Sequence, residues 1–196
     1  ACAGWSRLDL LAHLAATEEY FHAGIDGTVA DFLASMAAKG ATDVNSANQI
    51  GVEERRGAGA EVLLEQWRAG AAATVAAMRA RDGGEIDTSV GAYPCRWQAF
   101  HIASELATHA DDLGVPVTGA EAADRLDWRT RFSVFSLAES KPDLAVSPTG
   151  ATVHLADTEG LDVTLDATTF VHAVEGRLPP DAELPDGLAA RLSTMP

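Results

Sequence analysis

Three residues carry side chains that bind divalent metals, at a spacing that places them together. His101, Glu105 and His109 are each four residues apart in the sequence. On an α-helix this spacing puts side chains on one face, with neighbouring Cβ atoms about 5–6 Å apart. Two imidazoles and a carboxylate are common ligands of zinc and related ions. Because one helix face cannot surround an ion, a further ligand must come from another element.

His13 is the best candidate for that further ligand. It lies one turn after Asp9, between leucines, in a stretch with helical periodicity. Carboxylate and imidazole ligands on facing helices are one way in which helical bundles build metal sites. The residues alone leave two other interpretations open: His13 is a packed core residue, and Glu105 and His109 form an exposed contact within one helix.

Capping residues and apolar periodicity predict the elements that position these side chains. Ser6 is a candidate N-cap, with Asp9 three residues later as in a capping box, for a helix from Arg7 to Ile25. Further helices are predicted over residues 29–38, 60–81, 97–114 and 121–138. Residues 41–59 are polar and interrupted by glycines, which predicts mostly loop, and residues 91–94 are predicted as a turn.

The pattern changes after Lys141-Pro142. Short β-branched or alternating runs at 144–146, 152–155 and 161–165, separated by turn residues, predict a small antiparallel meander. Two short helices are expected at 168–175 and 187–192. The predicted fold class is therefore α+β, with a helical bundle over residues 1–140 and a small α+β domain over residues 141–196. Because residues 1–5 lead directly into a helix without a starting Met, we expect an N-terminal bundle helix to be missing.

Composition limits the classes of partner. The net charge is −15, from 29 acidic and 14 basic residues, which argues against binding to nucleic-acid phosphates or to anionic lipid. No apolar run reaches the roughly 18 residues of a membrane span, and no signal-peptide pattern is present. Cys2 and Cys95 form no C-x-x-C motif and are interpreted as two reduced thiols. We therefore expect a cytoplasmic protein, as a monomer or a homodimer.

Two segments resemble the signatures of the mycothiol-dependent maleylpyruvate isomerase family, part of the DinB-like superfamily of metal-binding four-helix bundles. The first runs from Cys2 to Leu14 and contains Gly4-Trp5, a short charged stretch and an apolar helix carrying His13. The second runs from Ser104 to Gly114 and contains Glu105, His109 and two aspartates. The C-terminal module is also similar to the family's smaller domain, through the segment Glu175 to Pro179.

The resemblance implies that His13, Glu105 and His109 are the metal ligands, with Zn²⁺ as the expected ion and Ni²⁺ as an alternative. The family does not require a histidine at His101, which could add a ligand, hold a water or pack. We expect it in the wall of a cofactor pocket. Asp112 either orients the ring of His109 or is, like Asp111, an ordinary acid on the helix surface.

Other polar residues are candidates for contacts with substrate and cofactor. Arg55 and Arg56 are candidate catalytic residues, because a guanidinium pairs well with a substrate carboxylate, but they could equally be surface ion-pair partners. Asn45 and Asn48 could bind the sugar hydroxyls of mycothiol, and turn formation is their alternative role.

The resemblance implies an enzyme that uses mycothiol, the low-molecular-weight thiol of actinobacteria, as a cosubstrate. Three protein ligands leave a metal position open for that thiol, which loses its proton when bound. Its thiolate can attack a small electrophile, giving isomerisation or S-transfer. Two alternatives remain at this point: a non-catalytic metal- or ligand-binding module, and a hydrolase that uses a metal-bound water.

Overall fold

The computed structural model describes residues 4–194 and divides the chain into two compact units, Ala1–Gly114 and Val115–Pro196. This boundary differs from the predicted one near residue 140. The difference concerns the helix α6 (Gly119–Ser140), which was expected in the bundle. Leu137 of α6 is fully buried in the core of the second unit, together with residues of the following sheet and helices. The helix therefore belongs to the second unit because its apolar face is buried there.

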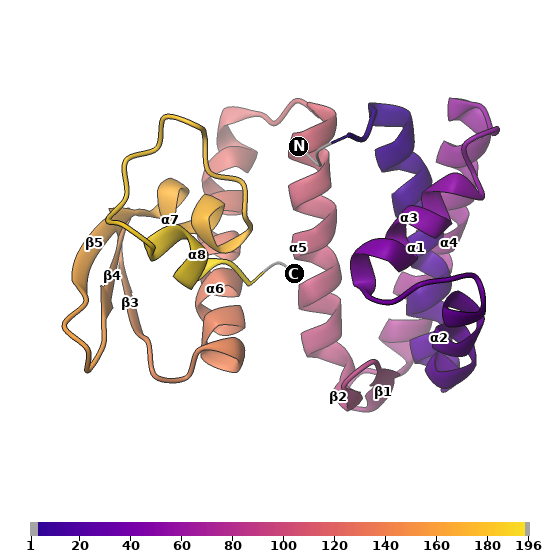
Figure 1. Ribbon diagram of the computed structural model, residues 1–196, viewed down its shortest axis with the longest axis horizontal. Helices are drawn as coiled ribbons and strands as arrows, with labels where there is room; N and C mark the ends of the chain where they lie inside the picture. The colour runs from indigo at the N-terminus through magenta and orange to yellow at the C-terminus, as the bar shows by residue number, and fades with distance from the viewer. Residues whose placement is uncertain (1–3, 195–196) are drawn as a thin grey trace. The chain divides into compact units, whose positions relative to one another are not determined.

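The first unit is a helical bundle with a short hairpin (Figure 1). Its elements in chain order are α1 (Arg7–Asp26), α2 (Val29–Ala38), α3 (Val44–Glu53), α4 (Ala60–Ala80), β1 (Glu85–Thr88), β2 (Gly91–Pro94) and α5 (Cys95–Leu113). The predicted helices are confirmed to within a few residues. Residues 91–94, predicted as a turn, instead form β2, which pairs antiparallel with β1 from Glu85↔Pro94 to Thr88↔Gly91.

Helix α1 forms the centre of this unit and packs against both α3 and α4. Ser6 caps it through the predicted box with Asp9, since Asp9 N–H donates to Ser6 Oγ and the Asp9 carboxylate accepts from Ser6 N–H. Gly27 ends the helix in the left-handed region, at φ 72°, where a glycine carries no Cβ penalty. Both ends of the helix that carries His13 are therefore fixed by local sequence.

The prediction of loop over residues 41–59 was wrong, because α3 lies within it. Asp43 caps this helix in a reciprocal arrangement with Ser46. Val52 is fully buried with Ala12 and Leu63, which anchors the helix on the core. A Cβ atom at Gly51 would lie 2.8 Å from the Cβ of Ala16, so the glycine allows α3 to approach α1 closely. The glycine that suggested a loop is thus used for helix packing.

The second unit joins α6 to a three-stranded sheet and two short helices. Its other elements are β3 (Ala145–Thr149), β4 (Thr152–Ala156), β5 (Asp162–Asp166), α7 (Ala167–Val174) and α8 (Leu188–Leu192). The strands pair antiparallel in the order β3-β4-β5, which confirms the predicted meander. Phe170, Val153 and Leu155 are fully buried in the core of this unit. The α+β class with an N-terminal helical domain is confirmed.

Among the helices of residues 4–194, none combines the length and apolar character needed to cross a membrane.

Candidate metal centre

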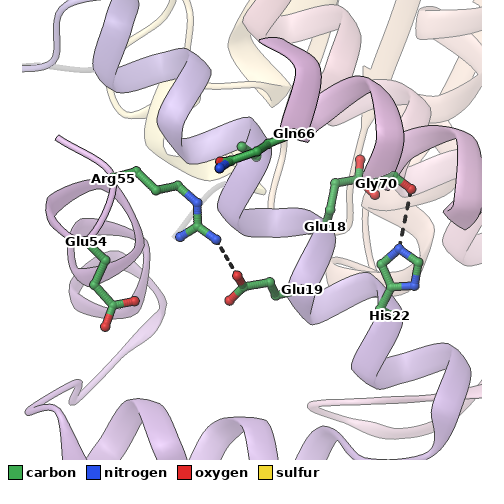
Figure 2. A pocket seen from close by; sticks show the side chains of 8 residues that line it. Glu18, Glu19, His22, Glu54, Arg55, Gln66 and Gly70 are labelled. Carbon is green, nitrogen blue, oxygen red and sulfur yellow. Dashed lines mark hydrogen bonds and ion pairs between the residues drawn. The ribbon is translucent and has the colours of Figure 1, made fainter. Parts of the chain in front are cut away.

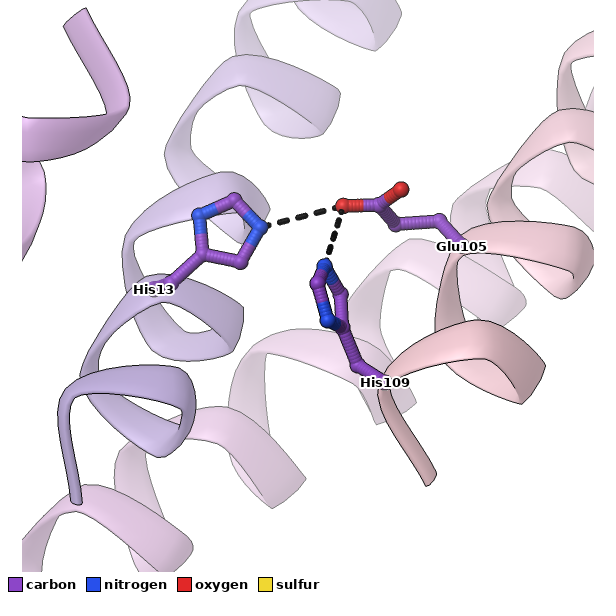
Figure 3. Close-up of side chains that lie close together, drawn as sticks. All are labelled: His13, Glu105 and His109. Carbon is purple, nitrogen blue, oxygen red and sulfur yellow. Dashed lines mark hydrogen bonds and ion pairs between the residues drawn. The ribbon is translucent and has the colours of Figure 1, made fainter. Parts of the chain in front are cut away.

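Three side chains from two helices of the first unit meet at one point (Figure 3). His13 comes from α1, and Glu105 and His109 come from α5. His13 Nε2 lies 3.0 Å from Glu105 Oε1, and His109 Nε2 lies 3.1 Å from the same oxygen. One candidate ligand atom from each residue lies within 4.8 Å of the others, and within residues 4–194 no other three His, Cys, Asp or Glu residues do so. We call these three residues the triad.

The triad is buried on the histidine side and more open on the carboxylate side. The side chains of His13 and His109 are each 4% exposed, whereas that of Glu105 is 27% exposed. The two imidazole rings meet edge to face, with centroids 4.9 Å apart. Glu105 is therefore the member of the triad with the best access to solvent.

Neighbouring side chains fix the position of His13. The indole of Trp5 lies against it, with ring centroids 5.1 Å apart. Trp5 Nε1 in turn donates a hydrogen bond to Gln49 Oε1 at 2.9 Å. Gln49 belongs to α3, where the sequence pattern predicted a loop, so this support was not predicted. The only signal in the sequence was the candidate cap formed by Asp43 and Ser46.

Asp112 holds the ring of His109, which is the orienting role considered from the sequence. Asp112 Oδ2 lies 3.1 Å from His109 Nδ1, and the carboxylate is buried. Because a carboxylate accepts hydrogen bonds, Nδ1 is the protonated nitrogen, and Nε2 is the atom directed at Glu105. A carboxylate that fixes the tautomer of an imidazole in this way is typical of metal-binding histidines.

The charges of the triad are strongly coupled. Burial acts to raise the pKa of Glu105, but hydrogen bonds and charge from His109 and His13 outweigh it and hold that pKa well below its usual range. Burial acts to lower the pKa of His109, but Glu105 and Asp112 outweigh it and raise that pKa above its usual value. Without a metal, the histidine therefore tends to hold a proton toward the carboxylate. A divalent cation takes the place of such protons when it binds ligands of this kind.

The donor set fits a divalent metal. Two imidazole nitrogens and one carboxylate oxygen are the ligands of several zinc enzymes, in which three protein ligands leave a position open. The three candidate ligand atoms already lie close together, one on α1, whose two ends are capped, and two on α5. The structure therefore brings together the three residues predicted as metal ligands.

The other predicted site residues lie elsewhere. His101 is half-buried on α5, one turn before Glu105, and its Nε2 lies 3.3 Å from the hydroxyl of Tyr93. Asn45 and Asn48 lie on α3, rather than in the loop that was expected. Their predicted roles as contacts of a cofactor stay predictions.

Both candidate arginines are in ion pairs. Arg55 pairs with Glu19 and also donates to the carbonyl oxygen of Gly51 at 3.1 Å. Arg56 Nε lies 3.4 Å from a carboxylate oxygen of Asp9. The surface ion pairing considered for both residues is thus present, and a catalytic role for them stays a prediction.

Comparison with known families gives a match over the first unit. Residues 1–114 match the family described as the mycothiol maleylpyruvate isomerase N-terminal domain. The chain belongs to this family. Comparisons with curated proteins and with solved structures gave no match.

The family match and the structure agree on the extent of the domain. The match to the mycothiol maleylpyruvate isomerase N-terminal domain ends at residue 114, which is also the last residue of the first compact unit. All three residues of the triad lie within it. The candidate metal centre is therefore contained in a single folded unit that carries the family match.

Proposed function

We propose that this protein is a metal- and mycothiol-dependent enzyme, either an isomerase or a thiol S-transferase, that acts on a small electrophile. The observation that carries the proposal is the convergence of two imidazoles and a carboxylate within a domain of the mycothiol maleylpyruvate isomerase family. The ligand set supports the metal, and the family's description, which names mycothiol, supports the thiol.

In this proposal His13, Glu105 and His109 hold the metal, with Zn²⁺ as the expected ion. The bound metal supplies positive charge that lowers the pKa of a thiol ligand, so that a thiolate forms at neutral pH. Asp112 keeps Nε2 of His109 available by holding the proton on Nδ1. Trp5 and Gln49 restrain the ring of His13, which reduces the motion that would weaken a metal ligand.

The thiolate of mycothiol can then act on an electrophile in two ways. It can add to an activated double bond, after which rotation about the resulting single bond and expulsion of the thiolate give the other geometric isomer. It can also displace a leaving group and remain in the product as a thioether. Arg55, Arg56, Asn45, Asn48 and His101 stay candidate contacts for the electrophile or for mycothiol.

Calorimetric titration with mycothiol tests the proposal. We expect mycothiol to bind the zinc-loaded protein and not the chelator-treated protein. A His13→Ala variant should lose zinc binding and, with it, thiol binding. His154→Ala is the control, because His154 is an exposed residue of β4 in the second unit. Absence of thiol binding to the zinc-loaded protein would contradict the proposal.

An activity assay separates the proposed function from the hydrolase alternative. The zinc-loaded protein is given maleylpyruvate or a reactive S-acceptor, with and without mycothiol. Turnover that needs both zinc and mycothiol is the expected result. If the zinc-loaded protein hydrolyses ester or amide substrates and mycothiol does not change the rate, the result would favour a hydrolase instead.

A further inference from the structure

A second polar site lies on the other side of α1. A cavity of about 490 Å³ is lined by residues of α1 and α4 and by the segment that follows α3 (Figure 2). Glu18 and His22 face it from α1, about 140° and 180° around the helix from His13 at 3.6 residues per turn. The cavity is therefore separate from the triad, although one helix serves both.

Two of the three carboxylates at this cavity already have a cationic partner. Arg55 pairs with Glu19, and the ammonium of Lys39 lies 2.7 Å from Glu54. Glu18 differs from both. Within residues 4–194 no lysine or arginine pairs with it, and its only hydrogen bond comes from Thr74 Oγ1, at 2.6 Å from Oε2. Its second oxygen, Oε1, has no partner among these residues.

Glu18 is also the most buried acid of the cavity, at 4% exposure. A carboxylate removed from water without a cation is unfavourable, and burial raises the pKa of Glu18, although the Thr74 hydroxyl and His22 partly oppose this. Buried acids with this kind of shift are found more often at functional sites than on inert surfaces. A ligand with a positive charge would therefore stabilise the ionised carboxylate of Glu18.

The neighbouring helix accommodates Glu18 through a glycine. A Cβ atom at Gly70 would lie 2.9 Å from both Cβ and Cγ of Glu18, too close for another residue without movement. A glycine inside a helix costs about 1 kcal/mol relative to alanine, and α4 carries it where Glu18 packs. Helix α4 is thus intrinsically less stable at Gly70, the position where it contacts the buried side chain of Glu18.

His22 extends the polar network. Its Nε2 lies 3.4 Å from the carbonyl oxygen of Gly70 and 3.4 Å from Thr74 Oγ1. Since the carbonyl only accepts and the Thr74 hydroxyl donates to Glu18, Nε2 carries the hydrogen. His22 therefore donates to Thr74, and Thr74 donates to Glu18. These two hydrogen bonds fix the orientation of the Glu18 carboxylate and leave its oxygen Oε1 for a ligand.

The residues at the cavity favour an organic cation over a metal ion. Glu18 and His22 are not part of any group of three candidate metal ligands found within residues 4–194. The cavity is large enough for a small molecule, and its lining is mainly glutamate, glutamine, histidine and arginine. We propose that it binds a small hydrophilic molecule with a primary ammonium group, whose charge pairs with Glu18 while its other polar atoms contact Glu19 and Gln66.

Titration followed by ¹H–¹⁵N NMR tests this proposal. The probe is 3-aminopropan-1-ol, a cation at pH 7, and 1,3-propanediol is the neutral control of similar size. The protein is treated with chelator, so that no amine binds through a metal at the triad. We expect saturable shifts of the Gly70 and Thr74 amides with the amine only. Glu18→Gln should weaken binding at least about tenfold, because the ammonium group then faces a neutral amide in place of a carboxylate charge.

Two further measurements keep the outcome clear. Glu65→Gln, at an exposed glutamate of α4 outside the cavity lining, should bind the amine as the wild type does. In wild-type protein with ¹³C-labelled glutamate, the amine should lower the pKa of the Glu18 carboxyl and the diol should not, whether or not Glu18→Gln folds. No saturable shifts, equal shifts with the diol, or an unchanged Glu18 titration would overturn the proposal.

Discussion

Each unit of the protein contains a carboxylate with nitrogen partners, and the two clusters are built differently. In the second unit, Glu175 accepts hydrogen bonds from Arg129, with Nε at 3.1 Å from one oxygen and Nη2 on the other. Both side chains are buried. In the first unit, two imidazole nitrogens face a single oxygen of Glu105, which is partly open to solvent.

The difference lies in whether the cluster is complete by itself. A guanidinium and a carboxylate match each other in charge and in planar geometry, so the Arg129–Glu175 pair balances its charge without a metal ion. It joins α6 to the end of α7 and belongs to the structure of that unit. The triad brings three potential lone-pair donors to one point and needs a proton or a metal ion between them. Burial alone therefore does not distinguish a structural cluster from a ligand site.

The largest effect is expected from breaking the complete pair. Glu175→Gln removes the carboxylate charge that faces the buried Arg129 guanidinium, and should lower the free energy of unfolding by about 3–5 kcal/mol. Denaturant unfolding measures the change. Asp127→Asn is the control, because Asp127 and Arg131 form an exposed pair at 2.8 Å whose loss should cost about 0.5 kcal/mol or less. Similar losses for both variants would mean that the buried pair has no special structural role.

Adding zinc tests whether the triad, unlike the Arg129–Glu175 pair, binds a metal ion. A ligand that binds only the folded state stabilises it by about 2.7 kcal/mol at 100 times its dissociation constant. We expect zinc to raise the unfolding temperature of the wild-type protein and of Asp127→Asn, but not that of His109→Gln. Equal stabilisation of His109→Gln would show that zinc acts at another place.

A smaller loss is expected from Asp112→Asn. The amide can still occupy the same space, but it no longer provides a negative charge to hold the proton on His109 Nδ1. Loss of such an outer partner typically lowers metal affinity about 10–100-fold, without loss of the ligands themselves. Competition with a zinc-binding dye measures the affinity. Asp111→Asn, at the exposed neighbouring position, should leave it near the wild-type value.

Much of the fold could be predicted because it is specified by local sequence. The Ser6–Asp9 box marked the start of α1, and the alternating runs after residue 142 marked the meander. Helix α3 was missed because its glycine and asparagines resemble a loop, and only its contact with Ala16 shows why Gly51 is there. The domain boundary was missed because the burial of α6 depends on distant residues, which no local pattern encodes.

The site was predicted in part for the same reason. Glu105 and His109 are related by helical spacing, which a sequence displays directly, whereas their meeting with His13 depends on the packing of α1 against α5. Glu18 was missed because an acidic residue in a helix usually faces solvent, and its burial depends on Gly70 of another helix. Helical spacing thus indicated two of the three candidate ligands, and the family resemblance supported His13 as the third.

The pH dependence of stability is the smallest expected effect. It distinguishes the metal-free triad, in which His109 holds a proton, from the zinc-bound triad. In the metal-free protein, Glu105 and Asp112 raise the pKa of His109 against the opposing effect of burial. The folded state then binds this proton more tightly than the unfolded state, whose histidine has a pKa of about 6.5. The resulting stability is fully present below that pH and is lost as pH rises through the raised value.

Metal-free wild-type protein should therefore lose stability relative to His109→Gln as pH is raised above about 6.5. Zinc should reverse the sign, since it competes with the same proton, so that stabilisation by zinc grows over the same range. Thermal unfolding of both proteins, with chelator and with zinc, measures the four curves. If the curves for wild type and variant run parallel in chelator, folding does not raise the pKa of His109. That result would contradict the view that the triad needs a proton or a metal ion.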